Sequence, residues 1–183
     1  MKHLAVPLVV AFFLGAGIGP AVAADSHPVK GGKPAAAQAR VVTDVELIQE
    51  LRSHRERPVV LHFWATWCGP CLSELPNVAE LAQDAQRRGI DFVAVSLDDP
   101  SARGTQHVSA VLAQRVRDPH WSRVLRVTDI ERFVASIDPS WEGEIPAFFA
   151  FGHDAKLRRM HLGDITRGEF EGLIAGLVAA EKP

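Results

Sequence analysis

A pair of cysteines in the segment WCGPC, residues 67–71, joins an apolar run to a helical pattern. The run before it, residues 58–65, is continuously apolar and rich in β-branched and aromatic side chains, which is typical of a central strand covered on both faces. The pattern after it keeps helical spacing as far as Arg88, and Gly89 suits a left-handed C-terminal cap. The sequence therefore predicts an α/β fold with the cysteine pair at a helix N-terminus.

The helix N-terminus determines the chemistry expected of the two thiols. Amide groups in the first turn of a helix lack backbone partners and the helix end carries partial positive charge, so a thiolate at Cys68 is stabilised there. We therefore expect Cys68 to be nucleophilic near neutral pH. Cys71 lies one turn further along, where it can form a short-loop disulfide with Cys68; we expect it to be the more buried, resolving thiol. Pro70 suits an early helical position, which needs no amide donor.

Strand-like patterns recur along the rest of the chain. Residues 90–98 form a second apolar run, so strand, helix and strand predict a βαβ unit with a right-handed crossover. Residues 145–151 and 156–162 flank a turn and predict an antiparallel hairpin. These patterns predict a central mixed β-sheet flanked by helices on both faces.

Helical patterns occupy the segments between the predicted strands. The first helix begins at Thr43 and places Val45, Ile48 and Leu51 at helical spacing. The other helices are expected within residues 100–120, from Thr128 with a capping box to Glu131, and over residues 166–180.

The composition excludes several classes of function. Lys and Arg total 20 against 22 Asp and Glu, so no strong positive field is available for nucleic acid. Two cysteines are too few for a disulfide-stapled scaffold. Two methionines and eight scattered histidines argue against a metal site, which needs clustered ligands. We therefore expect a single domain that binds neither nucleic acid nor metal.

The N-terminal residues resemble an export signal. Residues 1–23 carry Lys2, an apolar run and the small-residue motif Ala21-Val22-Ala23, which together predict a cleavable signal peptide. The alternative, an uncleaved membrane anchor, is disfavoured because the apolar run is shorter than the ~20 residues that a membrane span needs. Residues 24–40 predict a flexible linker, and residues 41–183 the folded domain. The expected location is an oxidising compartment such as a bacterial periplasm.

The segment PVVLHFWATWCGPCLSELP, residues 58–76, resembles the active site of the thioredoxin superfamily. More narrowly, it is similar to TlpA/ResA-like extracytoplasmic thiol–disulfide oxidoreductases, and the resemblance extends over residues 41–181. It implies a thioredoxin-like fold with an insertion, at about residues 98–140, before a hairpin that begins with a cis-proline.

The resemblance also implies roles for individual residues. Pro146 matches the cis-proline beside the cysteine pair, and the backbone of Ile145 is then free to pair with a substrate chain. Glu74 matches a glutamate that tunes the cysteine acidities; the alternative is a surface glutamate of the early helix. Trp67 matches a platform for docking a partner. Gly69, together with Pro70, matches the dipeptide of reducing thioredoxins.

Two aromatic positions remain open. His62 stands where thioredoxins carry a buried aspartate, so it is either a base for Cys71 or a neutral core imidazole hydrogen-bonded to backbone. Trp141 either forms part of the substrate rim or packs in the core. We expect Trp64 and Phe63 to be core residues.

The resemblance implies an enzyme that reduces disulfides through Cys68 attack and Cys71 resolution, with no cofactor beyond the redox-active Cys68–Cys71 disulfide. Expected partners are client proteins with cysteine pairs, such as apocytochrome c, and a membrane thiol electron donor. One alternative is a disulfide-forming oxidase on the same fold. A copper-binding chaperone is disfavoured because the chain lacks methionine clusters, and a peroxidase would need a different cysteine motif.

Overall fold

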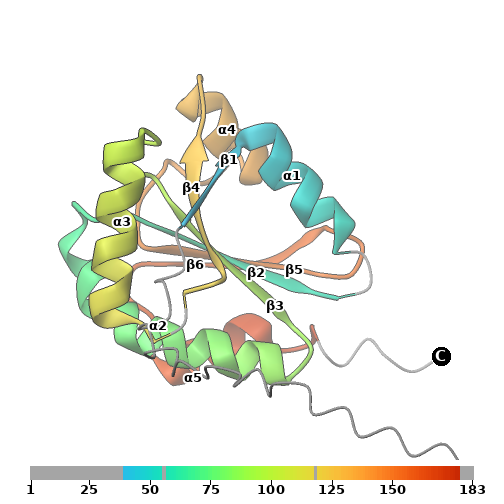
Figure 1. Ribbon diagram of the computed structural model, residues 1–183. Coiled ribbons are helices and arrows are strands. Elements are labelled where there is room, and N and C mark those ends of the chain that lie inside the picture. Colours follow the sequence, from blue (N-terminus) through green and yellow to red (C-terminus); the bar gives the residue numbers. More distant parts are fainter. Residues whose placement is uncertain (1–38, 55–56, 118, 178–183) are drawn as a thin grey trace, which may run out of the picture. The chain divides into compact units, whose positions relative to one another are not determined.

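Six strands form one mixed β-sheet in the computed structural model of the protein, which describes residues 39–54, 57–117 and 119–177 (Figure 1). The strands lie in the order β1-β4-β3-β2-β5-β6. The first four in this order are parallel, and β5 and β6 are antiparallel to their neighbours. The strands are β1 (Arg40–Thr43), β2 (Val59–Trp64), β3 (Asp91–Ser96), β4 (Ser122–Arg126), β5 (Ala147–Phe151) and β6 (Leu157–Leu162).

In the part of the chain that the structure describes, five helices cover the two faces of the sheet, which confirms the predicted architecture (Figure 1). One layer consists of α2 (Gly69–Arg87), α3 (Ala102–Arg115) and α5 (Arg167–Ile174), whose buried side chains form one apolar cluster. The other layer consists of α1 (Asp44–Ser53) and α4 (Ile130–Ile137), which contribute to a second cluster. Because both layers pack on β2, all six of its residues are buried. The predicted central strand is therefore confirmed.

The strand-to-helix unit that carries the cysteines also forms as predicted. Strand β2 leads into α2, α2 ends just before Gly89, and Gly89 has a φ of 78°. The chain then returns as β3, parallel to β2. The hairpin of β5 and β6 adds antiparallel strands on the other side of β2.

The structure corrects the predicted face of the first helix. Thr43 caps α1 through a capping box with Glu46, as the sequence suggests. Of the three predicted positions, Leu51 is buried and Ile48 is partly buried against the core, but Val45 is 60% exposed; Leu47 is buried in addition. The two leucines are one turn apart, so they share the face that packs on the sheet.

Two strands and two helix ends differ from the predictions. The short strands β1 and β4 were not predicted, and β1 begins inside the expected linker, at Arg40. Helix α4 is capped by Asp129, whose side chain accepts from the Arg132 amide, rather than by Thr128. Helix α5 ends at Ile174, before the expected end at residue 180, and Gly176 follows with a φ of 84°.

Several predictions fall outside the described residues. The signal peptide at residues 1–23 and nearly all of the linker at 24–40 lie there, as do residues 178–180 of the predicted last helix. Within the three described ranges, every helix is too short or too polar to cross a membrane. The segment 98–140, which the resemblance marks as an insertion, forms α3, β4 and α4.

Candidate active site

The cysteine pair lies at the N-terminus of α2. Cys68 is the N-cap residue, and its Sγ accepts a hydrogen bond from the Cys71 amide at 3.2 Å. A disulfide joins the two residues, whose Cα atoms are 5.3 Å apart. Cys71 is fully buried, whereas Cys68 is 7% exposed, so the predicted difference in burial is confirmed. Gly69 and Pro70 form the exposed first positions of the helix, as the sequence predicted.

The loop before β5 lies against Cys68. The Ile145–Pro146 peptide bond is cis, which confirms the conformation expected from the resemblance. The carbonyl oxygen of Ile145 is 3.8 Å from the Sγ of Cys68. The carbonyl of Pro146 accepts a hydrogen bond from the Gly163 amide at 2.8 Å, which ties the loop to the chain after β6. Residues 145 and 146 therefore lie beside the redox pair. They precede β5, which pairs with the edge of β2 that β3 does not occupy.

Trp141 supports this loop from the core. Its ring packs on Phe63 and Phe149, with centroids 4.8 Å and 4.9 Å away, and it is almost fully buried. Its Nε1–H donates a hydrogen bond to the Glu144 carbonyl at 2.9 Å, just before Ile145. Of the two interpretations of Trp141, packing is the better description. The expected core positions of Phe63 and Trp64 are confirmed.

Trp67 is the most exposed large apolar side chain of the site. It is 67% exposed and lines an open groove of about 650 Å³. The exposed Ile130 and the half-buried Leu97 and Val127 contribute apolar surface to this groove. The exposed carboxylates Asp99, Glu131 and Glu142 also line it. The site thus has an apolar surface with acidic groups next to the cysteine pair.

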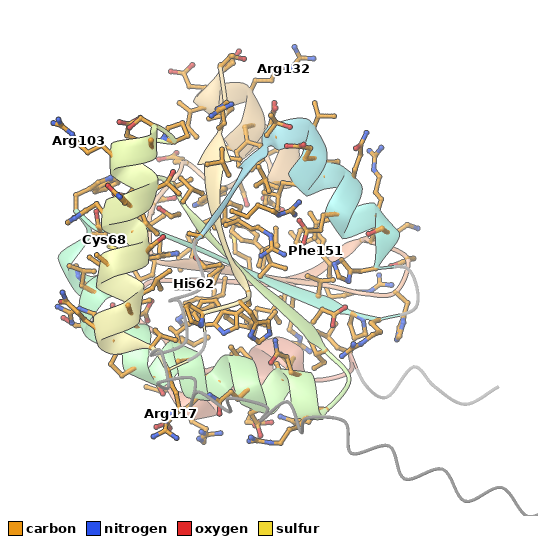
Figure 2. The ribbon with its side chains drawn as sticks, in the orientation of Figure 1. His62, Cys68, Arg103, Arg117, Arg132 and Phe151 are labelled. Carbon is orange, nitrogen blue, oxygen red and sulfur yellow. A yellow bond between two sulfur atoms is a disulfide. The ribbon has the colours of Figure 1, made fainter. Side chains whose placement is uncertain are left out.

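Glu74 and His62 form a buried pair between α2 and β2. His62 lies in the interior of the molecule and is fully buried (Figure 2). Its Nε2 is 3.2 Å from the Oε1 of Glu74. The Oε2 of Glu74 accepts a hydrogen bond from the Ile165 amide at 3.2 Å. The ring of His62 stacks on Phe148, with centroids 4.2 Å apart and planes 9° apart. Burial lowers the pKa of His62, and the hydrogen bond and charge of Glu74 oppose that shift only in part.

These contacts resolve two alternatives that the sequence left open. Glu74 is 8% exposed, so its interpretation as a surface glutamate is wrong. His62 is a core imidazole, but its partner is a carboxylate rather than the backbone. The two residues are 12 positions apart, and only the packing of α2 on β2 brings them together.

Sequence reasoning missed Asp98, which anchors the loop before the cysteines. Its carboxylate accepts hydrogen bonds from the Thr66 amide at 2.8 Å, from the Thr66 hydroxyl and from the Ser96 hydroxyl at 2.6 Å. Asp98 is 8% exposed, and these donors compensate for the burial of its charge. In sequence it is the first of two aspartates after a strand, a pattern typical of any turn.

No group of three or more His, Cys, Asp or Glu side chains able to hold a metal ion occurs within residues 39–54, 57–117 and 119–177. The chemistry that the site offers is that of its two sulfurs. A Cys-x-x-Cys disulfide at the start of α2, facing a cis-proline on a mixed sheet of this topology, defines a thioredoxin-like thiol–disulfide oxidoreductase.

Comparison with known proteins agrees with this class. The chain belongs to the Redoxin family, whose model matches residues 35–175. It is 27% identical over 135 residues to the thiol-disulfide oxidoreductase ResA of Bacillus thuringiensis strain Al Hakam, covering 73% of this chain and 72% of that protein. The protein is a TlpA/ResA-like member of the thioredoxin superfamily and a thiol–disulfide oxidoreductase.

Two solved structures from Chlorobium tepidum share the fold. A thiol:disulfide interchange protein of the thioredoxin family superposes with a TM-score of 0.54 at 19% identity, over 69% of this chain and 83% of that one. A thiol:disulfide interchange protein DsbE superposes with a TM-score of 0.53 at 25% identity, over 71% of this chain and 84% of that one. The mixed sheet with flanking helices is therefore thioredoxin-like.

Proposed function

We propose that the protein reduces disulfides of client proteins outside the cytoplasm, with Cys68 as the attacking thiol and Cys71 as the resolving thiol. The observation that carries this proposal is the place of Cys68. Its sulfur lies at the N-terminus of α2, accepts a hydrogen bond from the Cys71 amide and belongs to the more exposed of the two cysteines. A thiolate there is stabilised by the helix end, and Cys68 is the cysteine of the pair that is not completely buried.

The reaction consists of two thiol–disulfide exchanges. The Cys68 thiolate attacks one sulfur of the client disulfide, a bond forms between these sulfurs, and the other client sulfur leaves as a thiolate that takes up a proton. Cys71 then loses its proton and attacks Cys68, forming the Cys68–Cys71 disulfide and releasing the second client thiolate. The client gains two electrons and the enzyme loses two, so no cofactor beyond the cysteine pair is required.

Client binding in this proposal uses the surface around Cys68. The backbone of Ile145 pairs with an extended client segment in strand fashion, since its carbonyl lies 3.8 Å from the reacting sulfur. Trp67 gives the client an exposed aromatic surface, and the adjoining groove offers apolar contacts and carboxylates. Clients with cysteine pairs, such as apocytochrome c, follow from the resemblance to ResA-like proteins.

The proposal includes a location and a source of electrons. Residues 1–23 direct export and are removed, so the mature chain works in the periplasm. An oxidising compartment supplies no reduced thiol pool, so a membrane thiol donor must return the enzyme to its dithiol form. The Gly69-Pro70 dipeptide favours the reducing direction. Disulfide-forming oxidases of the DsbA type lie near −120 mV, against about −270 mV for thioredoxin, so the potential separates the two directions.

Trapping the mixed disulfide tests the proposal. A peptide with an internal disulfide between the cysteines of a C-x-x-C-H segment serves as the probe. Cys71→Ser should accumulate a covalent complex with the peptide through Cys68, and Cys68→Ser should form none. If neither variant traps the peptide and wild-type protein does not reduce it, the enzymatic roles of both cysteines are refuted. A measured potential near −120 mV, the region of DsbA, would instead refute the reducing direction alone.

A further inference from the structure

The hydrogen-bond geometry of the His62–Glu74 pair determines which ring nitrogen of His62 carries the proton. Burial lowers the pKa of His62, so its imidazole is neutral and carries one ring proton. The Nε2 atom faces the carboxylate of Glu74, whereas Nδ1 has no hydrogen-bond partner among the described residues. A proton on Nδ1 would be a buried donor without an acceptor, which is unfavourable. The proton therefore resides on Nε2, and His62 donates it to Glu74.

Glu74 consequently has two hydrogen-bond donors and lies one helical turn from a buried thiol. The Nε2–H of His62 and the amide of Ile165 each donate to one of its two oxygens. Cys71 lies three residues earlier on α2, and residues three apart are neighbours on a helix surface. Cys71 is fully buried, so the proton that it loses on attacking Cys68 has to pass to a group inside the protein.

We propose that His62 is a positioning residue, whose Nε2–H donates a hydrogen bond that orients Glu74 so that Glu74 accepts the Cys71 proton during resolution. This inference rests on the proposed function. The S–H bond of Cys71 breaks and its proton passes to a Glu74 oxygen. A bond forms between the sulfurs of Cys71 and Cys68, and the client sulfur leaves with the electron pair of its bond to Cys68. His62 keeps its own proton throughout and donates rather than accepts.

The groups around the imidazole of His62 are mostly aromatic, which favours its neutral form as a hydrogen-bond donor to Glu74. On β3 and β5 the neighbours are aromatic rings, Phe92 at 6.4 Å and Phe148 at 4.2 Å between centroids. Phe148 also contacts the ring of His161 on β6, edge-on at 6.2 Å, and His161 Nε2 lies 2.9 Å from the Asp164 carbonyl. The chain before α5 contributes the Ile165 amide. These contacts bring one titratable group near the pair, His161 across the Phe148 ring, and helical spacing adds Cys71, one turn from Glu74.

Reaction of the reduced protein with a symmetrical aryl disulfide, whose released thiolate is coloured, separates the two steps. The first equivalent of thiolate reports the attack of Cys68, and the second reports resolution by Cys71. His62→Phe retains a flat ring against Phe148 but has no donor, whereas His62→Gln retains an N–H donor that does not titrate. We expect His62→Phe to slow the second phase at least about tenfold at neutral pH, a fraction of what a general base contributes.

The same experiment gives a pH profile that a purely structural role would not change. A buried carboxylate that loses a donor binds its proton more tightly, so His62→Phe should move the acid limb of the second phase to higher pH. His62→Gln should stay within about threefold of wild type because it restores the donor, a loss well below that of a general base. His54→Phe alters a histidine–carboxylate pair with Asp91 at the opposite end of the sheet, and both phases should remain as in wild type.

Two variants keep the inference testable if His62→Phe fails to fold. Glu74→Gln removes the proton acceptor and should slow the second phase by itself. His62→Gln in the Glu74→Gln background should cause no further loss, because the donor then has no carboxylate to hold. An unchanged second phase in His62→Phe or in Glu74→Gln, or equal slowing by His62→Gln and His62→Phe, overturns the inference. If the reduced wild-type protein shows no first phase, the proposed function is overturned instead.

Discussion

The buried imidazole of His62 makes the stability of the fold depend on pH. In the unfolded chain a histidine titrates near pH 6.5, whereas burial lowers the pKa of His62 in the folded protein. Below about pH 6.5 the unfolded chain therefore binds a proton that the folded protein does not, and the free energy of unfolding falls with decreasing pH. Above the unfolded pKa both states are neutral at this position, and its contribution to stability is complete.

The structure sets the size of this effect. His62 is fully buried, so solvent screening does not reduce it. One proton difference gives a slope of about 1.4 kcal/mol per pH unit, or about 2 kcal/mol between about pH 6.5 and pH 5 if the folded state stays neutral throughout. His62→Phe removes the titrating group, so its stability should decrease less steeply over the same interval, whatever its stability at neutral pH.

Urea unfolding of the oxidised protein at a series of pH values measures both slopes. We compare wild type and His62→Phe in the window above about pH 5, where most carboxylates are still ionised. The free energy of unfolding of wild type should therefore fall relative to that of His62→Phe as the pH decreases from about 6.5. Parallel curves for the two proteins would refute the statement that His62 is neutral in the folded state.

Three further variants test the packing around the site by urea unfolding. Asp98→Asn loses acceptor capacity for its three donors and should cost about 2 kcal/mol, whereas Glu131→Gln, at an exposed position, should leave the stability nearly unchanged; equal effects would contradict the anchoring role. Trp141→Phe loses one hydrogen bond to the loop before the cis-proline and should cost about 1 kcal/mol, and no loss would show that the bond is not formed. Thr43→Ala removes the cap of α1 and should cost about 1 kcal/mol, a loss that Thr43→Ser should largely avoid.

Much of the fold follows from local patterns. Strand β2 is predictable because its six residues are buried on both faces and therefore form a continuous apolar run. Helix α2 is predictable because its apolar spacing continues to a glycine cap. Strands β1 and β4 have four and five residues and contain arginines, so their apolar signal is too short to recognise; they form because they pair with each other and β4 pairs with β3.

The site was predictable where one segment carries it. The WCGPC motif gives both sulfurs and the helix end, and the resemblance places Pro146 beside them. The contacts of His62 with Glu74 and of Asp98 with Thr66 join residues 12 and 32 positions apart. Such contacts depend on how α2 and the loop after β3 pack against β2. The residue types alone therefore left a core imidazole and a base as alternatives for His62.

We infer that the end of α2 keeps the sulfur of Cys68 ionised, and the proposed attack on clients depends on it. Its most direct test is the pH dependence of alkylation at Cys68 in the reduced protein, followed by mass spectrometry with Cys71→Ser as the single-thiol control. We expect Cys68 to reach half of its maximal rate at or below about pH 7.5, the upper bound for thiols at helix N-termini. A midpoint at pH ~8.5, as for free cysteine, would contradict the inference that the helix end stabilises the Cys68 thiolate.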